Sequence, residues 1–173
     1  ISLTGSGTLN NVMPGYYSGG IRMTGSGSMT LLPGIYILNG HGLSITGSGS
    51  FTALNCLFYI VGNGDVTLTG SGAQTITAPD PDVAWYPGAD TYEGISFFQS
   101  RSNTNYARIT GSGSFSVGGT IYMPSNELRI TGSGDQLGNQ LIVNTLDISG
   151  SGTIFVPYDG RNSGNSNNAF LVD

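Results

Sequence analysis

The chain contains no lysine, one cysteine and one histidine, and charged residues make up only 9% of its 173 residues. The five basic residues are all arginines, against ten acidic residues, so the formal net charge is −5. So little positive charge cannot neutralise a phosphate backbone, and we therefore expect no nucleic-acid partner. No apolar run reaches the roughly 20 residues that a membrane-spanning helix needs, so we also expect no membrane span.

The single cysteine and the single histidine exclude further classes of site. Cys56 has no partner for an internal disulfide, and its neighbours Leu57 and Phe58 favour a small buried side chain over a reactive thiol. A zinc site needs several His or Cys ligands, and the chain offers one of each. His41 lies between two glycines, which favours an exposed turn residue over a catalytic base.

A four-residue mark, Thr-Gly-Ser-Gly, spaces the chain. It begins at Thr4, Thr24, Thr46, Thr69, Thr110 and Thr131, and it returns as Ser-Gly-Ser-Gly at Ser149. The starts are 20, 22, 23, 41, 21 and 18 residues apart. A nearly fixed period of this size is typical of a solenoid, in which each repeat is one coil of a stack.

Aligning the coils on this mark produces columns of like residues. Large apolar residues stand one position before it, at Leu3, Met23, Ile45, Leu68, Ile109, Ile130 and Ile148. Apolar residues also stand three positions before it, at Ile1, Ile21, Leu43, Val66, Ala107, Leu128 and Leu146. The residues between these two columns are nearly all polar, and such alternation predicts a strand with one buried face. Equivalent strands of successive coils then form a parallel sheet.

Two further segments complete each coil. After the glycines, which tolerate the positive φ of a corner, a second apolar column contains Leu9, Met29, Phe51, Phe115 and Ile154, interrupted by Gln74 and Gln136. A third segment is rich in aromatic and β-branched residues, which we expect to fill the bore. The sequence therefore predicts an all-β, right-handed parallel β-helix with three short strands per coil of about 18–23 residues and about seven coils.

The domain organisation follows from where the period breaks. We expect one β-helix domain over residues 1–156, with a proline-containing loop insertion at residues 79–93. The double spacing between Thr69 and Thr110 is expected to hold an extra coil together with this insertion. Residues 157–173 form an Asn/Ser/Gly-rich tail that ends in a short predicted strand.

The insertion is the best candidate for a binding site. Four acidic residues within it suit Ca²⁺, which takes six to eight oxygen ligands: Asp80, Asp82, Asp90 and Glu93. Its aromatic residues suit contact with a sugar or a protein partner: Trp85, Tyr86 and Tyr92. The alternative is a solvated loop whose tryptophan packs back on the solenoid.

The sequence gives weaker support to two other functions, polysaccharide cleavage and ice binding. Arg108, Arg129 and Asp147 occupy one outward column on successive coils, but without a convergent carboxylate pair they indicate surface Arg–Asp pairing rather than a polysaccharide-active enzyme. We therefore expect no enzymatic activity. An ice-binding surface would use ranked hydroxyls, but only one threonine per coil stands at the mark, and the corner glycines place it on a bend.

Several stretches resemble the β-helical C-terminal region of bacterial TadG-like, Tad/Flp pilus-associated proteins and related secreted surface proteins. The resemblance is carried by Leu32–Gly40 (LPGIYILNG), Gly94–Asn103 (GISFFQSRSN), Gly119–Pro124 (GTIYMP) and Leu171–Asp173 (LVD). It implies an exported, cell-surface or extracellular solenoid, and it carries over no catalytic residues.

These observations together predict a secreted or cell-surface structural protein, because a lysine-free surface rich in Thr, Ser and Asn suits export. Open β-helix ends expose unpaired strand edges, so we expect head-to-tail stacking of copies into a filament. The expected subunit contacts are Ile1, Leu3, Phe170, Leu171 and Val172. The alternative function is a carbohydrate-binding adhesin that uses the insertion.

Overall fold

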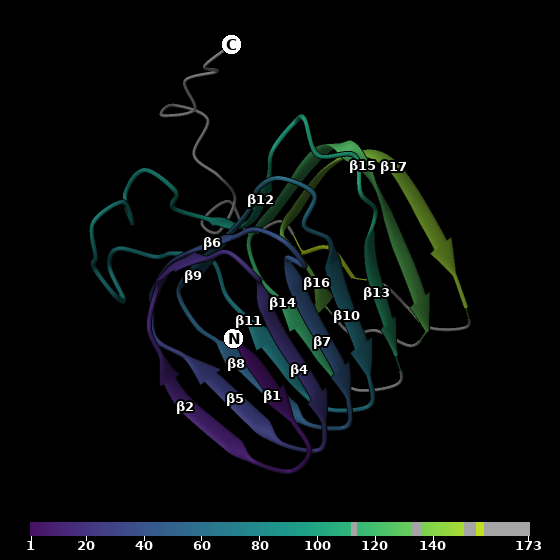
Figure 1. Cartoon of the computed structure of the whole chain (residues 1–173). Coiled ribbons are helices and arrows are strands. Elements are labelled where there is room, and N and C mark those ends of the chain that lie inside the picture. Colours follow the sequence, from purple (N-terminus) through teal and green to yellow (C-terminus); the bar gives the residue numbers. More distant parts are fainter. Residues whose placement is uncertain (112–113, 133–135, 151–154, 158–173) are drawn as a thin grey trace.

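The computed structural model describes residues 1–111, 114–132, 136–150 and 155–157 (Figure 1). The described residues form 17 strands and no helix, and every strand pairing between coils is parallel. Within these ranges, no helix is long and apolar enough to cross a membrane. The prediction of an all-β parallel β-helix with three strands per coil is confirmed.

The strands stack into three faces. The first face contains β1 (Ser2–Thr4), β4 (Ile21–Gly25), β7 (Leu43–Gly47), β10 (Val66–Gly70), β13 (Ala107–Gly111) and the C-terminal parts of β15 (Thr120–Gly132) and β17 (Gln140–Ser149). The second contains β2 (Thr8–Val12), β5 (Ser28–Leu31), β8 (Ser50–Ala53), β11 (Gln74–Ile76), β14 (Phe115–Val117) and β16 (Gln136–Leu137). The third contains β3 (Gly15–Tyr17), β6 (Gly34–Leu38), β9 (Cys56–Ile60), β12 (Ile95–Gln99) and the N-terminal parts of β15 and β17.

The strands β15 and β17 pass from the third face to the first without a break. The first and third faces therefore join in one 11-stranded sheet, and the second face is a separate 6-stranded sheet. The first face has seven strands and the second and third have six each, so the solenoid has about six turns, close to the expected number of about seven.

The expected extra coil between Thr69 and Thr110 does not exist. Thr69 pairs directly with Thr110, so the 41 residues from one to the other make a single coil. The added length lies in the segment 77–94 and in the turn 100–106. Lengthening a loop adds only slowly to the entropy of closing it, so a coil can carry such insertions, and spacing alone does not separate them from a further coil.

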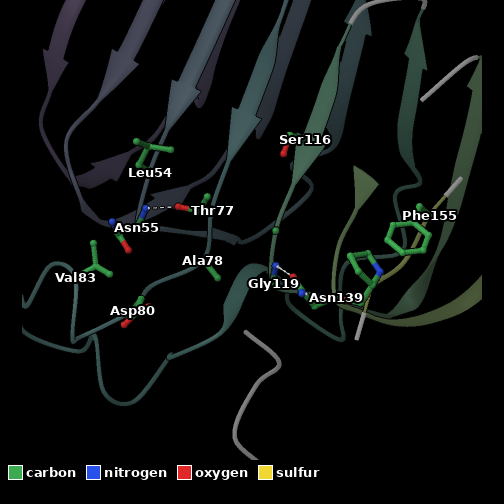
Figure 2. A pocket seen from close by; sticks show the side chains of 12 residues that line it. Leu54, Asn55, Thr77, Ala78, Asp80, Val83, Ser116, Gly119, Asn139 and Phe155 are labelled. Atoms are coloured by element: carbon green, nitrogen blue, oxygen red, sulfur yellow. Dashed lines mark hydrogen bonds between the residues drawn. The ribbon is translucent and has the colours of Figure 1, made fainter. Parts of the chain in front are cut away.

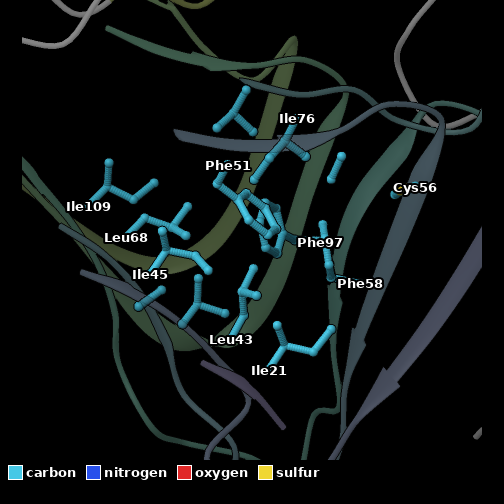
Figure 3. Packing of buried hydrophobic residues seen from close by; sticks show 14 of the residues in the cluster. Ile21, Leu43, Ile45, Phe51, Cys56, Phe58, Leu68, Ile76, Phe97 and Ile109 are labelled. Atoms are coloured by element: carbon cyan, nitrogen blue, oxygen red, sulfur yellow. The ribbon is translucent and has the colours of Figure 1, made fainter. Parts of the chain in front are cut away.

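The bore is filled by the columns that the alternation predicts. Leu43 and Val66 are opposite each other and fully buried, as are Ile45 and Leu68. The Phe58 ring lies between those of Tyr36 and Phe97, and its centroid is 5.6 Å from that of Tyr36 and 5.3 Å from that of Phe97. Phe51 points at the same cluster from the second face (Figure 3). Burying each such ring stabilises the fold by roughly 1.5–3 kcal/mol.

Gln74 is a polar exception within the second face. It pairs with Phe51 and Phe115 in the expected register, so the column is interrupted by a polar residue rather than shifted. The side chain is buried, and its Oε1 atom has no hydrogen-bond partner among the described residues.

The two positions of each mark that hold glycine require it for different physical reasons. Gly47 adopts a φ of +115°, which favours glycine, whereas a Cβ on Gly49 would lie 2.0 Å from the carbonyl oxygen of Gly27 in the coil before. The N–H groups of Ser48 and Gly49 both donate to the Gly25 carbonyl, at 2.9 and 3.0 Å. The backbone hydrogen bonding between coils therefore continues around the corner.

The threonine of the mark is not on the bend. Thr46 lies inside β7, in register with Thr24 and Thr69, and the corner begins at the following glycine. The prediction that these threonines lie on the bend is therefore wrong. The first glycine of the mark is the last residue of the strand, and the bend comes after it.

Candidate functional site

The insertion between β11 and β12 is the largest departure from the coil. It contains turns and no strand, and the N–H of Gly94 donates to the Pro79 carbonyl at 2.9 Å, which closes its base. In Figure 1 it is the teal loop that projects beside β6 and β9.

Part of the insertion packs against the solenoid. The Tyr86 hydroxyl donates to the Asn55 carbonyl at 3.0 Å, and burial raises the pKa of Tyr86 well above its usual value. Ala89 is fully buried, and a Cβ on Gly88 would lie 2.8 Å from Ile35 Cδ1. The loop thus covers the outward side of β6, and Tyr86 anchors it there.

The three predicted aromatic contacts of the insertion have different environments. Tyr86 is held by Asn55, and Tyr92 is half-buried beside Gly88. Trp85 is 68% exposed, next to the equally exposed Val83. Of the three, Trp85 is the side chain with a large free surface for a partner.

The predicted calcium ligands do not form a cluster. Asp80 Oδ1 accepts the N–H of Asp82 at 3.0 Å, which is a local turn contact. Among the residues that the structure describes, no group of three or more His, Cys, Asp or Glu side chains could hold a metal ion. This holds also for the four predicted ligands Asp80, Asp82, Asp90 and Glu93. The calcium site stays a prediction from composition.

A groove of about 650 Å³ lies at the base of the insertion, along the corner between the second and third faces (Figure 2). Its apolar walls include the exposed side chains of Leu54, Val83 and Phe155. The remaining lining residues are Asn55, Thr77, Ala78, Asp80, Ser116, Gly118, Gly119, Asn139 and Pro157. The groove is open to solvent, and its lining mixes apolar and polar side chains.

Two of the polar groups in this groove hold the backbone in place. Thr77 Oγ1 accepts the N–H of Asn55 at 2.8 Å, and Asn139 Oδ1 accepts the N–H of Gly119 at 2.5 Å (Figure 2). Asn139 Nδ2 also donates to the Pro157 carbonyl at 2.9 Å. The groove therefore has fixed edges.

A second surface, which we name the outer ladder, runs along the outside of the third face. Its members are in register from coil to coil: Tyr16, Ile37, Tyr59, Phe98, Tyr122 and Ile142. The rings of Phe98 and Tyr122 stack with centroids 4.9 Å apart, and Tyr59 meets Phe98 edge-on at 5.1 Å. The prediction that the aromatic residues of this segment fill the bore is correct for Tyr36, Phe58 and Phe97 and wrong for those of the outer ladder.

Polar side chains brace the ladder at two points. Arg101 donates from Nε and Nη2 to the Tyr122 hydroxyl at 3.1 and 3.0 Å, and Asn39 Nδ2 donates to the Tyr16 hydroxyl at 3.0 Å. Alternation within strands such as Ile35-Tyr36-Ile37 could have revealed the ladder, but both sides of these strands are apolar.

The arginine column is confirmed in register, but its expected pairing is wrong. Arg108 lies opposite Arg129, which lies opposite Asp147. In the described residues, Arg129 forms its ion pair with Glu127, at 2.9 Å, and both arginines lie over the Tyr106 ring, at 5.9 and 5.2 Å. The hydrogen bond from Arg129 lowers the pKa of Glu127. Arg129 Nη2 donates to Glu127 Oε2, so this ion pair lies within β15 rather than between β15 and β17.

The C-terminal open end of the solenoid exposes core columns. Ile148 and Leu146 of β17 are 54% and 45% exposed, whereas their equivalents in β15, Ile130 and Leu128, are 5% and 0% exposed. In the described residues β17 pairs only with β15.

The N-terminal end and the predicted tail contacts complete the list of expected subunit contacts. Ile1 is 42% exposed and Leu3 is half-buried, and β1 pairs only with β4 within the described ranges. The predicted contacts Phe170, Leu171 and Val172 lie outside the described residues.

Comparisons of the chain with protein-family models, with curated proteins and with solved structures found no match. The resemblance to TadG-like proteins therefore stays a prediction from the sequence.

Proposed function

We propose that this protein is a structural solenoid whose copies stack head to tail outside the cell. The observation that carries the proposal is the exposure of Leu146 and Ile148 at the open edge of β17, in columns that are buried in the coil before. An open edge with apolar side chains is a template for another strand.

The register within the chain says which strand fits this edge. β4 follows β1 with Met23 opposite Leu3 and Thr24 opposite Thr4. If β1 of a second copy follows β17 in the same way, Ile1 falls opposite Leu146, Leu3 opposite Ile148, and Thr4 opposite Ser149. Such a heterologous contact repeats without closing, so it produces a filament.

The outward columns support a role in an aqueous, extracellular setting. The first face carries a rank of hydroxyl side chains in register: Thr4, Thr24, Thr46, Thr69, Thr110, Thr131 and Ser149. These hydroxyl groups share the first face with the charged side chains of Arg22, Arg108, Arg129 and Asp147, and the chain contains no lysine.

A charged substitution on the open edge tests the assembly. We expect wild-type protein to form filaments in negative-stain micrographs and concentration-dependent mass in light scattering. Ile148→Glu places a charge in the core column of the junction and should leave monomers only. Gln140→Glu is the matched control, because it adds the same charge to an exposed position of β17 opposite Thr120 and should still assemble. Wild-type protein that stays monomeric at high concentration would overturn the proposal.

A carbohydrate-binding module is a second candidate, favoured by the groove beside the insertion. Its walls offer apolar surface from Leu54, Val83 and Phe155, its lining offers amide, hydroxyl and carboxyl groups, and Trp85 lies exposed on the same insertion. Neutral glycans need this mixture of apolar contact and oriented polar groups.

A further inference from the structure

We propose that residues 170–172, Phe-Leu-Val, add the strand that the third face lacks in the last coil. This strand would lie along the N-terminal part of β17, with Leu171 beside Ile142. The contact forms within one chain, so it does not depend on the proposed stacking. If copies also stack, β3 of the next copy lies against this added strand rather than against β17.

The three faces do not end at the same coil. Among the described residues, the first face has seven strands and the second and third have six each. The second face continues past β16, because the Leu137 N–H donates to the Phe155 carbonyl at 3.0 Å. The last coil, which begins with the C-terminal part of β17, therefore has its first two faces. Its third face is the next position that the chain reaches.

The N-terminal part of β17 exposes core columns at this position. Leu141 and Val143 are half-buried, whereas their partners in β15, Ile121 and Met123, are each only 1% exposed. Within the described ranges β17 pairs with β15 on one side and has no partner strand on the other. An open edge with uncovered apolar side chains is a template for a further strand.

The described chain ends at the entrance to this open position. Asn139 and Pro157 are equivalent residues of successive coils, since each comes eight positions after the start of its mark. Asn139 comes directly before β17, and its Nδ2 atom donates to the Pro157 carbonyl at 2.9 Å. The chain therefore leaves Pro157 at the corner between the second and third faces.

The sequence indicates which of the remaining residues fit the third face. A chain that continued without a loop would place Asp159 and Arg161 in the two core columns of this face. Burying charged side chains in apolar columns is costly. Residues 170–172 instead offer an apolar residue at both inward positions, with Leu171 pointing outward between them.

A loop at this corner has a precedent in the same chain. The insertion between β11 and β12 also leaves the second face and returns to the third. The Gly94 N–H donates to the Pro79 carbonyl, so that loop comes back beside the place where it left. The stretch between Pro157 and residue 170 is shorter than this insertion, and the entropy of closing a loop grows only slowly with its length.

A cysteine pair tests the contact. Paired residues of adjacent strands are about 4.8 Å apart, which lies within the Cα separation of about 4.4–6.8 Å that a disulfide needs. We would make Ile142→Cys/Leu171→Cys, with Gln140→Cys/Leu171→Cys as the matched control. Gln140 is exposed on the same side of β17, and two residues along the strand put it roughly 8 Å from residue 171 in the proposed contact. Native Cys56 is buried and can stay.

The expected result in dilute solution is a disulfide within one chain. After mild oxidation, the Ile142→Cys/Leu171→Cys protein should keep the mass of a monomer and show one free thiol when denatured, that of Cys56, instead of three. The control pair should keep three. Cross-links only between chains would mean that the tail pairs with a second copy and would overturn the assignment, as would no cross-link or equal cross-linking of the control. None of these outcomes bears on head-to-tail stacking.

Stability provides a second measurement that needs no cross-link. Phe170→Asp should lower the urea midpoint, because it removes the apolar cover of β17. Asn168→Asp adds the same charge just before the strand and should leave the midpoint unchanged. A midpoint of Phe170→Asp equal to that of the wild type would overturn the packing of residue 170 on the third face.

Discussion

Thr69 and Thr110 are adjacent in the first sheet although they are 41 positions apart in the chain. The same coil therefore closes whether or not it carries the insertion. Because Gly94 N–H reaches the Pro79 carbonyl, the two ends of the loop already meet.

Deleting residues 80–93 should consequently leave the β-helix intact. We expect an unchanged β-sheet circular dichroism spectrum and a lower urea midpoint, because Ile35 loses the cover of Gly88 and the Tyr86 anchor to Asn55 is removed. Loss of the β spectrum would show instead that the coil depends on the loop.

Gly49→Ala should destabilise the fold, because its Cβ would lie 2.0 Å from the Gly27 carbonyl oxygen. Overpacking against backbone costs roughly 1–3 kcal/mol or more in the free energy of unfolding. Gly7→Ala is the matched control, since this equivalent glycine of the first coil has its nearest neighbour, Leu3 Cδ1, at 3.5 Å. We expect the control to change the free energy of unfolding by about 0.5 kcal/mol at most. Equal losses in the two variants would contradict the close-approach explanation.

Cys56 should be inert in the folded protein, because burial raises its thiol pKa to about 12. Iodoacetamide should label it at pH 8 only after denaturant is added. The unfolded thiol titrates near pH 9, so its contribution to stability is fully present below pH 9 and is lost as the pH rises towards 12.

Comparing wild type with Cys56→Ala isolates this contribution from that of the buried tyrosines, whose pKa values burial also raises. The stability difference between the two proteins should change between pH 9 and pH 12 and stay constant below pH 9. A difference independent of pH over the whole range would contradict the burial argument.

If the groove and insertion bind glycans, Trp85→Ala should abolish binding while changing the free energy of unfolding by no more than about 0.5 kcal/mol, since the side chain is exposed. Trp85 is the only tryptophan, so its fluorescence reports on binding in the wild type. Tyr106→Ala, which removes an exposed aromatic on another face, is the control and should bind normally. Normal binding by Trp85→Ala would exclude this tryptophan as the contact.

The fold follows from the sequence because each coil repeats the same constraint. Alternation at positions such as Leu43 and Ile45 predicts the first face, and the mark gives its register. The number of coils is less well determined, because the spacing between Thr69 and Thr110 fits either a further coil or a long loop. Only the pairing decides between them.

The surfaces were harder to predict than the core. In Tyr36-Ile37 and Phe58-Tyr59, neighbouring residues on opposite sides of a strand are both apolar, so alternation does not say which ring faces outward. The groove is lined by residues far apart in the chain, with Leu54 and Val83 at one end and Phe155 at the other (Figure 2), so no local pattern predicts it. The ion pair of Arg129 with Glu127 rather than Asp147 depends on side-chain reach.

The backbone contact between Gly25 and Gly49 also bears on how such a protein can change in length. Each corner rests on the main chain of the corner before it, and no side chain is needed to define it. A duplicated coil would make the same backbone contacts with the corner before it, and the coil after it would make them in turn. We therefore expect variants of this protein to gain or lose whole coils with little effect on cross-section, whereas a change of a few residues inside a strand would misalign every column that follows.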